Sequence, residues 1–297
     1  MSSENQSAEV RIVEVGPRDG LQNESRHLSI EDRAELGRRL AASGVGQVEL
    51  VSFASPAHVP QMAGAEEVPE LVDADASTWA GLVLNERGLQ RALATSIDVV
   101  NVVYPLSDEF CRRNQNMSLG EAAAMADRVI RSAREAGRRV IGTLAVAFGC
   151  PFEGPVSERV VIEHANRLAE SGASEVVLAD TIGVGLPRQV RALVPAVIGE
   201  TGLPIGLHLR NTRNTGYVNA LEGVRLGVSC LDASVGGIGG CPFAPRATGN
   251  IATEDLVHLL EGEGISTGVD ISVLIDTAVW LTPILGKQLP GLVHRTV

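Results

Sequence analysis

Eight short apolar segments recur along the chain, and each is followed by a stretch in which apolar residues return every three or four positions. A short apolar run between polar loops is typical of a buried β-strand, and the wider spacing is typical of an amphipathic helix. The expected strands are 11–15, 47–51, 78–84, 97–103, 140–147, 175–179, 205–209 and 229–234. The helices expected after them are 30–44, 66–72, 86–95, 118–138, 157–171, 187–199, 217–226 and 253–261.

Two helix starts are marked by a capping residue. Ser29 precedes the first helix, and Ser118 with Glu121 three positions later has the spacing of a capping box. Residues 104–116, before the second of these caps, are mostly polar and are expected to form a long loop.

The regular alternation of strand and helix favours a parallel sheet, and eight such units favour a closed (β/α)8 TIM barrel. An open dinucleotide-binding sheet is the alternative, but it should show GxGxxG after the first strand, where this chain has Gly-Pro-Arg-Asp at 16–19. The segment after Gly268 is an apolar helix that extends the barrel. No shift of composition divides the chain, so we expect one domain over 1–297, with 1–8 as a flexible N-terminus and 287–297 as a tail.

Composition narrows the class of partner. Hydrophobic residues make up 44% of the chain, aromatic residues 3%, and the net charge is −11. Few aromatic rings and a negative charge disfavour nucleic acid and anionic membranes as partners. The four cysteines show no CxxC spacing, and neither a signal peptide nor a membrane-spanning apolar run is visible, which favours the cytoplasm.

Polar residues stand where the expected strands end. In a barrel these ends meet at one face, so side chains far apart in sequence come together there. The strand-end residues are Arg18, Asp19, Gln22, Glu49, Asp180, Thr181, His208 and Arg210, and the loop after the last strand adds Cys241 and Asn250. An Asp, a His and an Asn are plausible ligands for a divalent cation. The same types also cap loops or form structural hydrogen bonds, so both interpretations stay open.

The loop at 236–242 holds four glycines and a cysteine. Such a loop either moves or lies close to a ligand, and its thiol is then a candidate acid, base or nucleophile. In the alternative, the glycines form a tight turn and Cys241 packs as a small side chain.

The segment Val-Glu-Val-Gly-Pro-Arg-Asp-Gly-Leu-Gln-Asn-Glu at 13–24 resembles the opening signature of the 3-hydroxy-3-methylglutaryl-CoA lyase family. The resemblance continues through 52–56, 149–154 and 180–185, and it is strongest over 236–255. These segments cover nearly the whole chain in order.

The resemblance implies a barrel metallolyase that breaks a carbon–carbon bond in an acyl-CoA ester. It makes Asp19, His208 and Asn250 the ligands of Mg²⁺ or Mn²⁺, and CoA a part of the substrate. It assigns Arg18 to the enolate oxygen and Cys241 to proton transfer. Gln22, Glu49, Asp180, Thr181 and Glu254 match positions that surround or support the site. Relatives of this kind are commonly homodimers.

The chain departs from the family at two places. The family has His-x-His at the end of the seventh strand, whereas this chain has His208-Leu209-Arg210, and a guanidinium offers no lone pair to a metal. Three interpretations compete: a weakened metal site completed by Asn211 or water, a metal-free site in which Arg210 binds an anionic group, and a degenerate relative. Ser25 stands where relatives often have a lysine for the CoA phosphates, and Arg26 is the candidate substitute.

The predicted function is a lyase that cleaves a hydroxymethylglutaryl-CoA-type thioester into an acetyl-type product and a ketoacid. One alternative is a condensing acyltransferase of the same superfamily. The other is a metal-free, divergent or non-catalytic ligand-binding relative.

Overall fold

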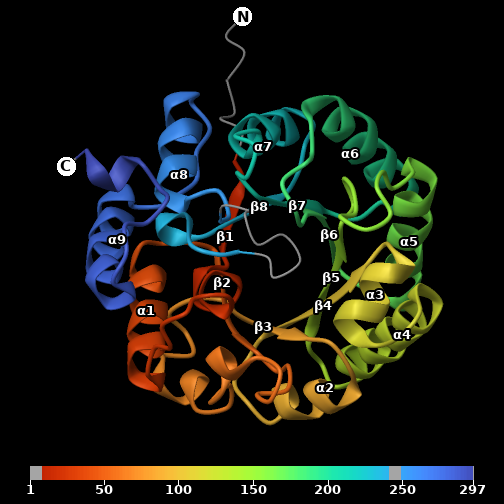
Figure 1. Cartoon of the computed structure of the whole chain (residues 1–297), viewed down its shortest axis with the longest axis horizontal. Coiled ribbons are helices and arrows are strands. Elements are labelled where there is room, and N and C mark those ends of the chain that lie inside the picture. Colours follow the sequence, from red (N-terminus) through yellow and green to blue (C-terminus); the bar gives the residue numbers. More distant parts are fainter. Residues whose placement is uncertain (1–8, 241–248, 297) are drawn as a thin grey trace, which may run out of the picture.

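The computed structural model describes residues 9–240 and 249–296. Eight parallel strands close in chain order into a barrel, and β1 pairs with both β2 and β8 (Figure 1). The strands are β1 (Arg11–Glu14), β2 (Gln47–Ser52), β3 (Trp79–Val83), β4 (Val99–Pro105), β5 (Arg139–Ala145), β6 (Glu175–Asp180), β7 (Ile205–Leu209) and β8 (Cys230–Ala233). The predicted TIM barrel is therefore confirmed.

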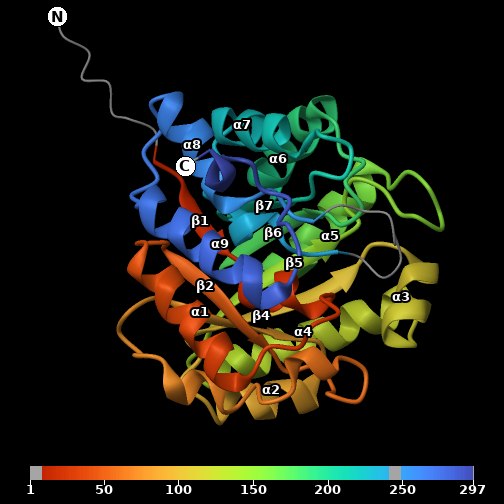
Figure 2. The ribbon, with the colours of Figure 1, turned by 60° about the vertical axis from the view of Figure 1, so that its left-hand side comes forward.

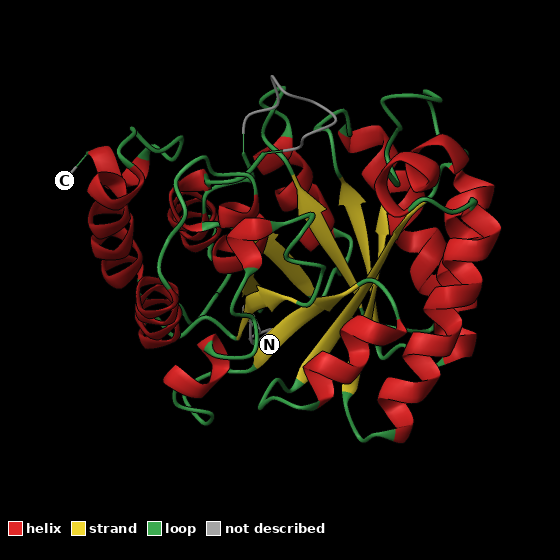
Figure 3. Cartoon of the chain, turned by 60° about the horizontal axis from the view of Figure 1, so that its bottom comes forward, coloured by secondary structure: helices red, strands yellow, loops and turns green. Residues whose placement is uncertain are grey.

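Helices surround the barrel and cover the outer faces of the strands (Figure 3). They are α1 (Ile30–Ala42), α2 (Glu86–Leu93), α3 (Asp108–Gln115), α4 (Leu119–Glu135), α5 (Glu158–Ser171), α6 (Pro187–Thr201), α7 (Gly216–Arg225), α8 (Thr253–Gly262) and α9 (Ile271–Leu285). Every residue of β2, β6 and β7 is buried, since helices cover one face and the barrel interior the other. This double burial explains why the strands read as nearly continuous apolar runs.

The last helix extends the barrel as predicted. α9 lies beside α1 (Figure 2), and the Arg39 guanidinium of α1 stands 4.8 Å from the centre of the Trp280 ring of α9. The chain then turns back through Leu289–Gly291 and the short turn η5 (Val293–Arg295) toward the loop after β8, where Gly291 N–H donates to Gly236 O at 2.8 Å. The C-terminal segment thus holds one side of the barrel mouth.

Two of the expected elements are wrong. A helix was expected over 66–72, but only Val68–Leu71 forms a turn of 3₁₀ helix, because Pro69 supplies no N–H and disfavours helical geometry before it. Residues 104–116 were expected as a loop, yet they contain α3. Its cap is the Ser107 hydroxyl, which accepts from Phe110 N–H at 3.3 Å. The polar surface of α3 hid its helical period.

The two predicted helix caps are confirmed. The Ser29 hydroxyl accepts from Asp32 N–H at the start of α1, and Ser118 with Glu121 forms a complete capping box before α4. Across the two described ranges, no helix is long and apolar enough to cross a membrane.

Candidate active site

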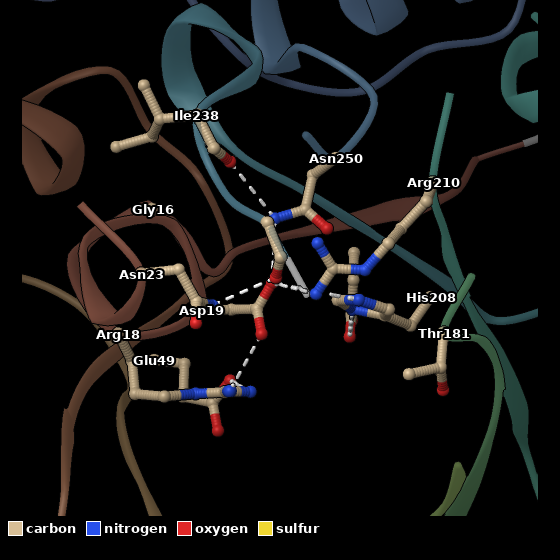
Figure 4. A network of polar contacts seen from close by, with 12 residues as sticks. Gly16, Arg18, Asp19, Asn23, Glu49, Thr181, His208, Arg210, Ile238 and Asn250 are labelled. Carbon is tan, nitrogen blue, oxygen red and sulfur yellow. Dashed lines mark hydrogen bonds and ion pairs between the residues drawn. The ribbon is translucent and has the colours of Figure 1, made fainter. Parts of the chain in front are cut away.

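The site begins in the single helical turn η1 (Gly16–Gly20) that follows β1. The backbone N–H groups of Asp19 and Gly20 both donate to Val15 O, at 2.7 and 3.1 Å, which turns the chain sharply over the barrel mouth. A Cβ on Gly20 would lie 2.6 Å from Ile238 Cγ1, so only glycine allows this turn to pack against the loop after β8. The local sequence thereby directs Arg18 and Asp19 into the network seen in Figure 4.

A chain of hydrogen bonds that runs from η1 through β2, β4 and β5 fixes Arg18. Its Nη2 donates to Glu49 Oε2 at 2.7 Å and its Nη1 to Asp19 Oδ1 at 3.0 Å. Asn101 Nδ2 donates to Glu49 Oε1 at 3.1 Å, and Thr143 Oγ1 donates to Asn101 Oδ1 at 2.8 Å. Burial raises the pKa of Glu49, and the charge of Arg18 offsets this only in part. Arg18 is therefore held rigidly, and its Nε is buried with no partner in the part of the chain that the structure describes.

Asp19 lies at the centre of the network. Its Oδ2 accepts from Arg210 Nη2 at 2.8 Å and from Asn250 Nδ2 at 2.9 Å (Figure 4). Burial alone would raise the pKa of Asp19, but the charges of Arg210 and Arg18 hold it well below the usual range. Asp19 is therefore a fixed carboxylate between two guanidinium groups.

His208 and Asp232 form a pair beside this carboxylate. His208 Nδ1 is 3.1 Å from Asp232 Oδ2, and its Nε2 is 3.9 Å from Asp19 Oδ2. Because the carboxylate of Asp232 accepts, Nδ1 carries a proton, and in the neutral imidazole the lone pair is then on Nε2. This is the arrangement of a general base oriented by a carboxylate.

Below these residues the barrel interior is closed. A cavity of about 10 Å³ lies among Glu49, Asn101 and Asp232, which is room for about one water molecule. A substrate must therefore reach His208 from the carboxyl ends of the strands.

The remaining predicted residues lie around the network or away from it. Asp180 accepts from the N–H groups of Val184 and Gly185, both at 2.9 Å, and so shapes the loop after β6; burial raises its pKa. Thr181 Oγ1 accepts from Val146 N–H at 2.8 Å.

The three predicted residues still to be placed are Gln22, Arg26 and Cys241. Gln22 is half-buried, and its Oε1 has no hydrogen-bond partner among the described residues. Arg26 does not join the network, since it is exposed and donates to Pro283 O of α9 at 3.3 Å. Cys241 lies outside the described residues.

Sequence reasoning missed Asp232, Asn101 and Thr143. Each is a polar residue inside an apolar strand, in β8, β4 and β5, and each side chain points into the barrel network. The aspartate in the apolar run Cys-Leu-Asp-Ala could have been noticed in the sequence. A charge buried in a strand is costly unless it has a partner, so its presence there indicates a functional or structural pair. Only the residues at strand ends were considered, so these interior positions were passed over.

The residues do not form a favourable site for a divalent cation. Asp19, His208 and Asn250 lie together as the resemblance implies, but the Arg210 guanidinium donates a hydrogen bond to Asp19 Oδ2, the oxygen that faces His208. At 4 Å, a divalent ion and a guanidinium repel by about 8 kcal/mol at an effective dielectric constant of about 20. Within 9–240 and 249–296, no group of three His, Cys, Asp or Glu side chains is arranged to hold a metal ion. The mechanism proposed below therefore uses no metal.

The family model described as HMGL-like matches residues 9–280. The chain belongs to the HMGL-like family. It is 43% identical to (R)-citramalyl-CoA lyase of Chloroflexus aurantiacus over 298 residues, which cover 96% of this chain and 94% of that protein. The family resemblance noted in the sequence is thereby confirmed.

Solved structures of the family agree with the fold. The hydroxymethylglutaryl-CoA lyase of Bacillus subtilis superposes with a TM-score of 0.94 at 36% identity, covering 97% of this chain and 98% of that one. A hydroxymethylglutaryl-CoA lyase of Acinetobacter baumannii in complex with coenzyme A and 3-methylmalate gives 0.93 at 34% identity, covering 99% and 96%.

Proposed function

We propose that this HMGL-like protein is a carbon–carbon lyase whose substrate is a 3-hydroxy-3-methylacyl-CoA thioester that carries a free carboxylate. Hydroxymethylglutaryl-CoA and citramalyl-CoA, the substrates in the names of its relatives, both belong to this class. The products are acetyl-CoA and a ketoacid. The observation that carries the proposal is the His208–Asp232 pair facing a carboxylate held between two guanidinium groups.

The reaction needs a base for the tertiary hydroxyl. His208 Nε2 takes the hydroxyl proton, and Asp232 stabilises the imidazolium that forms. The oxygen then forms the ketone of the ketoacid while the bond between C2 and C3 of the acyl chain breaks. Its electron pair moves onto the thioester carbonyl, giving the enolate of acetyl-CoA, which is protonated at carbon.

The enolate oxygen needs a positive group fixed in advance. Arg18 fits this role because Glu49 and Asp19 hold two of its nitrogens while its Nε stays without a partner. A preorganised charge in a buried site stabilises a developing anion far more than water does.

The other predicted roles remain part of this proposal. Cys241 supplies the proton to the enolate carbon, Gln22 offers its free Oε1 to the substrate, and Arg26 at the rim binds the CoA phosphates. Asp180 and Thr181 shape the loop that lines the substrate side.

We also place the protein in the cytoplasm and expect a homodimer. Cys111, Cys150 and Cys230 are buried and unpaired, which agrees with a reducing compartment. Size-exclusion chromatography with light scattering tests the dimer.

Incubation of the purified protein with hydroxymethylglutaryl-CoA and with citramalyl-CoA, followed by mass spectrometry, tests the proposal. We expect acetyl-CoA and a ketoacid from at least one of them, and loss of cleavage in Asp19→Ala and His208→Ala. Arg128→Ala, on the exposed face of α4, is the matched control and should retain activity. Near-wild-type rates in both site variants would refute the site assignment. Net synthesis from acetyl-CoA and the ketoacid, with no cleavage, would indicate a condensing enzyme instead.

A further inference from the structure

Arg210 is a buried cation with unused donors. Its side chain is 4% exposed, and among the described residues only Nη2 has a partner, the Asp19 carboxylate at 2.8 Å. Nε and Nη1 are both buried and make no hydrogen bond to any residue of 9–240 or 249–296. Buried polar atoms are nearly always paired in native proteins, so two empty nitrogens on one guanidinium indicate a binding partner that arrives from outside.

The backbone packs closely on two sides of this guanidinium. Arg210 is bridged to Asn250 in an antiparallel pair, which fixes the backbone beneath the guanidinium. On the far side, Gly239 has a φ of +134°, and a Cβ built on it would lie 3.5 Å from Arg210 Nη1 and 2.8 Å from Asn250 Nδ2. A side chain at this position would clash with the Asn250 amide and touch Nη1, so only glycine lets the backbone pass beside the guanidinium. Figure 4 shows the guanidinium between Asn250, Asp19 and His208.

We propose that Arg210 binds the free carboxylate of the substrate and serves as the fixed cation of the site, so that cleavage requires no divalent metal ion. This inference rests on the lyase function proposed above and names how that site recognises its substrate.

The chemistry of the guanidinium supports this role. It stays protonated at any working pH and matches a carboxylate with directed N–H donors. A carboxylate held at Arg210 places the hydroxyl carbon of the same short acid beside His208, whose Nε2 is 3.9 Å from the carboxylate that Arg210 also contacts. Arg210 would thus set both the specificity for carboxylate substrates and the position of the reacting hydroxyl.

The competing role is structural, in which Arg210 only holds Asp19 in place. The two roles differ in substrate selectivity. A carboxylate-binding Arg210 discriminates between a substrate and its methyl ester, whereas a residue that only positions Asp19 lowers both rates alike.

The first test compares kcat/KM for the carboxylate thioester with that for its methyl ester, in the wild type, Arg210→Gln and Arg210→Lys. We expect Arg210→Gln to lower the ratio of the two on the order of 100-fold, and Arg210→Lys to restore part of it. Equal loss for both substrates would overturn the assignment. Calorimetric binding of 3-methylmalate in EDTA gives a readout without turnover: binding that Arg210→Gln weakens supports the proposal, and binding that it leaves unchanged overturns it.

The second test concerns the metal. Cleavage by the wild type should stay within about twofold after EDTA treatment, since the cation is part of the chain. Cleavage that is lost in EDTA and restored by Mn²⁺ would overturn the inference while leaving the lyase function intact. No cleavage in either state would instead refute the proposed function, and the binding experiment would still decide the role of Arg210.

Replacement of Arg210 by histidine tests directly whether the guanidinium excludes a metal ion. Arg210→His removes the guanidinium and offers a lone pair beside Asp19 and His208, so we expect it to gain Mn²⁺ binding in electron paramagnetic resonance. Arg128→His, on the surface of α4, controls for an added imidazole. Equal Mn²⁺ binding at the site by the wild type, abolished by Asp19→Ala, would contradict the role of Arg210.

Discussion

Glu14 couples the stability of the barrel mouth to pH. Its carboxyl group is fully buried and accepts from the N–H groups of Gly16 and Val235, at 2.7 and 3.0 Å, and contacts the Thr253 hydroxyl. It therefore joins the end of β1 to the loop after β8 and to the start of α8. Burial raises the pKa of Glu14 from 4.5 to about 8, in spite of these hydrogen bonds, which lower it.

The sign of the effect follows from the raised pKa. Between pH 4.5 and about 8 the folded protein keeps the proton on Glu14 and the unfolded chain does not, so the free energy of unfolding falls as pH rises. The contribution is complete below pH 4.5 and is lost by about pH 8. At about 1.4 kcal/mol per pH unit, the whole loss has an upper limit of about 5 kcal/mol, of which about 3 kcal/mol falls between pH 5.5 and 8.

Glu14→Gln removes this ionisation and keeps the shape of the side chain. Urea unfolding at pH 5.5 and pH 8 should show a larger loss of unfolding free energy in the wild type than in the variant, by up to about 3 kcal/mol. Glu200→Gln, at an exposed position of α6, is the matched control and should follow the wild type. The same pH dependence in Glu14→Gln and the wild type would refute the reasoning.

Two further variants test the geometry of the site. Asp232→Asn removes the negative charge that stabilises protonated His208 and can turn an amide N–H toward Nδ1, which favours the wrong imidazole tautomer. We therefore expect kcat to fall about 10²-fold or more while the melting temperature changes little; a fall of less than threefold would speak against a general base at His208. Gly249→Ala places a Cβ 1.9 Å from Gly237 O, and this clash must displace the segment that carries Asn250. Binding of 3-methylmalate should therefore weaken at least about tenfold (about 1.4 kcal/mol). Gly262→Ala, where a Cβ meets no atom within 4 Å, is its control, and equal affinity in both variants would contradict this account.

The sequence by itself determined the barrel and the face on which its chemistry lies. The spacing of apolar residues can be read within each segment, so eight apolar strands followed by amphipathic helices could be recognised without coordinates. The rule that parallel strands end at one face then predicted that Arg18, Asp19, Glu49, His208 and Arg210 would come near one another, and the structure brings these five together.

Only the tertiary structure decided which side chain meets which. Register between neighbouring strands sets these contacts, and no local pattern encodes it: His208 lies opposite Asp232 because β7 and β8 pair at that position. In the same way Asn101 reaches Glu49 two strands away, and Arg210 reaches Asp19 across the closed barrel. The sequence showed that an arginine stands where the family has a histidine. That its charge rests on Asp19, with two nitrogens left for a ligand, depends on the closure of the barrel, because closure brings the end of β7 to the turn after β1.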